Sequence, residues 1–102
     1  MCNLKDAKRW IKLAEMQVKE NNVEKARESY LEAASIYVLQ LEFTKDNHLL
    51  KHANECYMKS KEVIGKKWEK VLTKQELAQR TLIELNEDKI TIEDLRMEIE
   101  NV

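Results

Sequence analysis

The sequence predicts an all-α protein, an antiparallel three-helix bundle with a C-terminal helical extension. Three observations lead to this fold class. First, the 102 residues include no proline and a single glycine, Gly65, whereas sheets and long loops need turn residues. Second, apolar residues recur at spacings of three and four, as on one face of an α-helix. Third, short polar segments interrupt this pattern, and short connections make consecutive helices antiparallel neighbours.

The first helix is expected from Leu4 to Val18. Its apolar stripe consists of Leu4, Ala7, Ile11, Ala14 and Val18, with Trp10 and Leu13 beside it. Asn21 and Asn22 then supply turn and cap chemistry, so the helix should end before them.

A second helix is expected from about Val23 to Phe43, and its pattern differs because it carries two apolar stripes. One stripe is Ala26, Tyr30, Ala33 and Tyr37, and the other is Leu31, Ala34, Val38 and Leu41. Two stripes imply packing against two neighbours. This helix should therefore be central, with its alanines allowing a close approach of the helices on either side.

The polar residues 44–47 predict a tight turn into a third helix, which carries Leu50, Ala53, Tyr57, Ser60 and Ile64 on one edge. Thr73 followed by Glu76 is a capping-box pattern and predicts a fourth helix containing Leu77, Ala78, Leu82 and Leu85. Thr91 can cap a further short helix. We therefore predict a three-helix bundle over residues 1–66 and a helical extension over residues 67–102.

Composition narrows the classes of function. The net charge of −1 argues against nucleic acid as the partner, because phosphate binding needs an excess of basic residues. No apolar run has the length of a membrane span, so we expect contact with membranes only indirectly. Two cysteines, Cys2 and Cys56, are too few for a disulfide framework and predict reduced thiols in a cytoplasmic protein.

One pattern of residues suggests chemistry. On a helix, His48, His52 and Cys56 share one face, where two histidines one turn apart can bind zinc. A single helix supplies no fourth ligand, however, and no third group orients Cys56 and His52 as a nucleophile pair. We therefore expect no metal, no cofactor and no catalysis, and a metal-dependent helical enzyme stays as an alternative that elemental analysis for zinc would test.

The order of residues from the first helix into the second resembles that of a known adaptor family. It runs Ala14, then residues 22–26 (Asn-Val-Glu-Lys-Ala), then Tyr30, Ala33 and Tyr37, and the third helix adds Tyr57, Met58 and Glu62. This pattern is similar to that of the MIT (microtubule-interacting and transport) domain, a three-helix adaptor found on AAA ATPases of membrane remodelling. The resemblance covers about residues 4–66, and helical hairpins of the tetratricopeptide (TPR) type share many of its packing positions.

The resemblance implies a protein-interaction module, not an enzyme, that binds tail segments of ESCRT-III-like partners. An AAA ATPase on the same or another chain would then be recruited. It also implies a ligand groove between the second and third helices, lined by Ala34, Val38, Leu41, Asn54, Met58, Lys61 and Glu62. Met58 and Glu62 lie one helical turn apart, and we expect them at the centre of this groove. Lys59 stands where the family often has an acidic residue, which leaves open whether a basic or an acidic ligand is selected.

Two further hypotheses follow from the sequence. A TPR-like scaffold or a self-associating structural protein would use the same apolar faces to bind copies of itself. Alternatively, the chain could fill its own groove, because an acidic stretch from Glu84 to Glu100 follows a basic one. Leu77 and Arg80 also resemble the Leu-x-x-Arg start of an MIT ligand helix.

Overall fold

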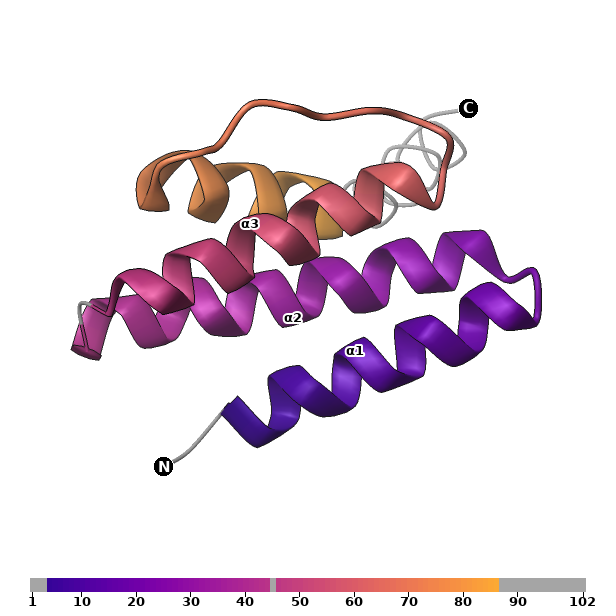
Figure 1. Cartoon of the computed structure of the whole chain (residues 1–102), viewed down its shortest axis with the longest axis horizontal. Helices are drawn as coiled ribbons and strands as arrows, with labels where there is room; N and C mark the ends of the chain where they lie inside the picture. The colour runs from indigo at the N-terminus through magenta and orange to yellow at the C-terminus, as the bar shows by residue number, and fades with distance from the viewer. Residues whose placement is uncertain (1–3, 45, 87–102) are drawn as a thin grey trace, which may run out of the picture.

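The structure, a computed structural model, describes residues 4–44 and 46–86, and within these ranges it contains helices and no strand (Figure 1). The helices are α1 (Leu4–Lys19), α2 (Val23–Thr44), α3 (Asn47–Glu62) and a fourth helix over residues 74–86. The predicted all-α class is confirmed. The short helix predicted after Thr91 lies outside the described residues.

α1 and α2 are joined by a tight turn at the two asparagines. Asn21 adopts the left-handed conformation (φ 61°), which asparagine tolerates better than most residues. The carbonyl of Asn22 accepts a hydrogen bond from the amide of Ala26 (3.0 Å) and so begins α2. Ser29 donates to the side chain of Gln17 across the hairpin (2.6 Å), so the predicted turn chemistry fixes α1 against α2.

α2 is the central helix, with α1 on one side and α3 on the other (Figure 1). Its alanines Ala26, Ala33 and Ala34 are completely buried, and α1 buries Ala7 and Ala14. Small residues at these positions let the helix axes approach closely, while Leu31 and Tyr57 fill the space between them. The two-stripe pattern of α2 therefore corresponds to two packed neighbours.

α3 begins and ends with residues suited to those positions. The carboxylate of Asp46 accepts a hydrogen bond from the amide of His48 (2.9 Å) and caps the first turn. At the other end, the amides of Gly65 and Lys66 donate to the carbonyls of Glu62 and Lys61 (both 2.9 Å). This is the Schellman arrangement, and Gly65 supplies the positive φ of 79° that it requires.

After Gly65 the chain runs back along α3 in an extended form before the fourth helix begins (Figure 1). The 16 residues of α3 span about 24 Å, and the eight extended residues 66–73 can reach about 26 to 29 Å. The extended segment is therefore just long enough to return to the start of α3. As a result, the fourth helix runs parallel to α3 rather than antiparallel to it.

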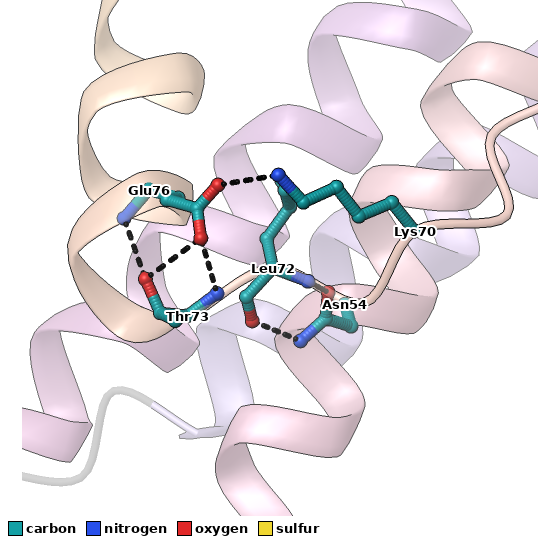
Figure 2. Close-up of polar contacts among 5 residues, drawn as sticks. All are labelled: Asn54, Lys70, Leu72, Thr73 and Glu76. Atoms are coloured by element: carbon teal, nitrogen blue, oxygen red, sulfur yellow. Dashed lines mark hydrogen bonds and ion pairs between the residues drawn. The ribbon is translucent and has the colours of Figure 1, made fainter.

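The predicted capping box opens the fourth helix (Figure 2). The amide of Glu76 donates to Thr73 Oγ1 (3.2 Å), and the amide of Thr73 donates to Glu76 Oε1 (3.4 Å). Lys70 adds an ion pair to the same carboxylate (3.2 Å). Among the described helices, none is long and apolar enough to cross a membrane.

Candidate functional site: the groove between α2 and α3

The groove between α2 and α3 is covered by a later segment of the same chain. Leu72, Leu77 and Thr81 are each at most 1% exposed. Both leucines belong to one buried cluster with Val38 of α2 and Tyr57 of α3. We call residues 72–84, which carry these contacts, the covering segment. Its position agrees with the hypothesis that the chain fills its own groove.

Asn54 of α3 holds the start of the covering segment through its backbone (Figure 2). The amide of Leu72 donates to Asn54 Oδ1 (2.8 Å), and Asn54 Nδ2 donates to the carbonyl of Leu72 (3.0 Å) and to that of Leu50 (3.1 Å). The side chain of Asn54 is buried. Because both contacts with Leu72 use backbone atoms, these hydrogen bonds do not depend on the side chain of the residue that Asn54 holds.

Two ion pairs lie at opposite ends of the fourth helix. Near its start, Lys74 pairs with Glu42 of α2 (3.0 Å), and both side chains are substantially exposed. Near its end, Glu84 Oε1 pairs directly with Lys61 of α3, and these two side chains are only 16% and 12% exposed. The Lys61 ammonium also lies 5.2 Å from the centre of the Tyr57 ring. The buried end therefore demands a carboxylate more strictly than the exposed end demands a cation.

Trp68 in the extended segment packs against α3. The Trp68 ring meets the Tyr57 ring edge to face, with 5.8 Å between the ring centres. The Arg80 guanidinium lies 4.7 Å from the centre of the Trp68 ring. Among the described residues, three polar side-chain atoms of this region are buried without a hydrogen-bond partner: Tyr57 Oη, Trp68 Nε1 and Glu84 Oε2. Each such atom weakens the packing it belongs to.

The seven predicted site residues do not all share one location. Ala34, Val38 and Leu41 are buried in the cluster that Leu72 and Leu77 join, while Asn54 and Lys61 bond directly to the covering segment. Met58 is half-buried. Glu62 is exposed and lines a separate hollow with Glu15, Val18 and Lys19 of α1. The structure therefore brings five of the seven to the covered groove and places Glu62 on the α1 side of α3.

Leu72 and Trp68 contribute to the site but were not predicted to do so. Leu72 directly precedes the helix cap Thr73, and Leu77 is the fourth helical residue after Thr73. This is the spacing of a hydrophobic staple, in which two apolar residues fix how the chain enters a helix. That signal could have identified Leu72, whereas no sequence pattern indicates the contact between Trp68 and Tyr57.

Of the three residues His48, His52 and Cys56, the two histidines are exposed and only Cys56 is buried. His52 stacks on Tyr37 (5.5 Å between ring centres) and lies 3.8 Å from the Glu55 carboxylate. Cys56 is buried, and burial raises the pKa of its thiol from 9.0 to about 12. Within residues 4–44 and 46–86, no group of three or more histidine, cysteine or acidic side chains is placed to hold a metal ion.

Comparison of the chain with models of known protein families, with curated proteins and with solved structures finds no match. The function is therefore inferred from the contacts of the covered groove and from the sequence.

Proposed function

We propose that this protein is a protein-interaction adaptor whose groove between α2 and α3 receives an amphipathic helical segment. The observation that carries the proposal is the covering segment itself. It is held by buried leucines, by the Asn54 clamp on a backbone and by the Lys61 ion pair. Helix-in-groove recognition uses the same combination of apolar anchors and charges at the rim. A groove that accepts one such helix from its own chain has the chemistry to accept one from a partner.

The resemblance to MIT domains favours a particular class of partner. On this proposal, residues 1–66 form an MIT-like antiparallel bundle, and the groove binds a tail segment of an ESCRT-III-like protein. An AAA ATPase on the same or another chain would be the recruited effector. The central position of α2, with its buried alanines, and the order of the three helices support this assignment.

A second candidate function, self-association as a TPR-like scaffold, is favoured by a different observation. Leu39 of α2 and Leu82 of the fourth helix are exposed and line one hollow with Leu85, and Ile83 is also exposed. Apolar side chains gathered on one face are typical of an interface. Light scattering of the full chain separates the two functions, because the adaptor is expected to be a monomer and the scaffold a defined oligomer.

Binding is tested with a fluorescently labelled peptide of residues 69–86 and the full chain carrying Leu77→Asp. This substitution puts a charge into the buried contact and should release the chain's own segment. The proposal predicts saturable binding of the peptide to this variant in the micromolar range. A folded variant that binds no peptide would remove the basis for assigning a ligand to this groove.

A further inference from the structure

We propose that the covering segment is a built-in competitor, so that a partner helix enters the groove only by displacing residues 72–84. This inference rests on the proposed function and adds two things to it. The resting protein is closed, and the partner is defined by chemistry: an amphipathic helix that runs parallel to α3 and carries a carboxylate opposite Lys61.

The contacts that join α1 to α2 and α2 to α3 do not pass through the covering segment. α1 packs on α2 and α2 on α3 through residues that precede position 63 in the chain. The connection from Gly65 to the covering segment is extended, and five of its residues are exposed: Lys66, Lys67, Glu69, Lys70 and Val71. Between Gly65 and Leu72, only Trp68 packs against the bundle. The connection therefore acts as a tether with one intermediate anchor.

The closed arrangement leaves some buried polar atoms without a hydrogen-bond partner. Of the three buried polar atoms that lack a partner in the described part of the chain, two belong to the tether and the covering segment and one lies beneath them. When the segment leaves, water reaches all three, and this part of the closing free energy is recovered. Thr81 adds a further weakness. It is buried at a core position, and its hydroxyl bonds back to the carbonyl of Leu77 in its own helix (2.7 Å).

The surroundings of Thr81 show how a partner would compete. Thr81 borders an open hollow lined mainly by apolar side chains, among them Val38, Ala78 and Leu85. A larger apolar side chain at this place could extend into that hollow and bury more surface than threonine does. A partner helix with leucine in the place of Thr81, and an apolar residue in the place of Leu77, would therefore bury at least as much apolar surface as the resident segment does.

The two ion pairs define the direction and charge of the partner. Lys61 is largely buried, and a helix that brought a cation to it would leave two like charges without compensation. Glu42 at the opposite end favours a basic residue at the start of the ligand helix. A basic start and an acidic end match only a helix that runs parallel to α3, as the resident helix does.

The competition can be measured with the labelled peptide of residues 69–86 and three versions of the full chain. A segment on a tether of this length has an effective concentration in the millimolar range. With a peptide affinity in the micromolar range, wild type should therefore bind the peptide roughly tenfold to a thousandfold more weakly than Leu77→Asp. Gln79→Asp is the matched control, because it adds the same charge to the same helix at an exposed residue that does not line the hollow beside Thr81. This control should bind as weakly as wild type does.

Each outcome decides a different claim. Equal, tight binding to wild type and Leu77→Asp would show an open groove and overturn the competitor, while the proposed function would stand. Absence of binding to both would remove the proposed function as well. If Leu77→Asp does not fold, Glu84→Lys takes its place, because it repels Lys61 without adding a charge to the leucine cluster. In wild type, adding unlabelled peptide to the ¹⁵N-labelled chain should shift the amide signals of residues 74–86, and unchanged signals at saturation would also overturn the competitor.

Discussion

Asn54→Ala is the substitution that most directly tests how the covering segment is attached. It removes both hydrogen bonds to the backbone of Leu72 and leaves a buried amide and a buried carbonyl without partners. An unsatisfied buried polar group costs about 1 to 3 kcal/mol. Because the segment can swing out and expose both groups to water, the loss cannot exceed the free energy of docking. We expect docking to weaken by about 1 to 3 kcal/mol, which changes the ratio of closed to open protein by about fivefold to 150-fold.

The assay for Asn54→Ala separates the covering segment from the bundle. In a Trp10→Phe background Trp68 is the sole tryptophan, and its fluorescence reports the tether while far-UV circular dichroism reports all helices. In a urea titration, the fluorescence midpoint of Asn54→Ala should fall below its dichroism midpoint. The control Lys51→Ala, at an exposed site one turn earlier on α3, should leave both midpoints together. Unchanged midpoints in Asn54→Ala would refute the assigned role of the clamp.

Three further predictions concern the core, the thiol and the helix cap. Ala33→Leu should destabilise the protein by about 1 to 3 kcal/mol in a denaturant titration, because Ala33 is fully buried between helices, and wild-type stability would contradict the close packing of α2. In a Cys2→Ser background, Cys56 should react with iodoacetamide at pH 8 about a thousandfold more slowly than in the unfolded chain, since burial raises its pKa from 9.0 to about 12. Comparable rates would show that the thiol is accessible. The hydrogen bond from Lys70, followed by that from the Thr73 amide, lowers the pKa of Glu76. The stabilisation that ionised Glu76 gives to the folded state is therefore present above its unfolded pKa of 4.5 and is lost as the pH falls through its lower folded pKa. Amide signals at the start of the fourth helix should change in this pH range in wild type but not in Glu76→Gln.

Much of the fold could be predicted from local signals. The apolar spacing, the asparagine turn and the capping box of Thr73 and Glu76 each depend on residues within one or two turns of one another. The parallel direction of the fourth helix could not be predicted in this way. It results from the extended form of residues 66–73, which is stabilised by Asn54, a residue 18 positions before Leu72 in the chain.

The site was predictable only in part, for a related reason. Lys61 and Glu62 are adjacent on α3, about 100° apart around the helix axis, so the sequence allows either to face the groove. Packing against α2 sets the rotation, and it directs Lys61 toward Glu84 and Glu62 toward α1. The expectation that Leu77 belongs to a ligand-like helix agrees with its burial. Arg80 of the same pattern instead contacts Trp68, which no local pattern links to it.

The central claim, that the groove between α2 and α3 receives a helix with a carboxylate opposite Lys61, is tested most directly by a charge exchange. The measurement is the affinity of the labelled peptide of residues 69–86 for Leu77→Asp, with and without Lys61→Glu. We predict that Lys61→Glu abolishes binding of the natural peptide and that a peptide carrying Glu84→Lys restores it. Equal affinity of both peptides for both proteins would contradict the claim.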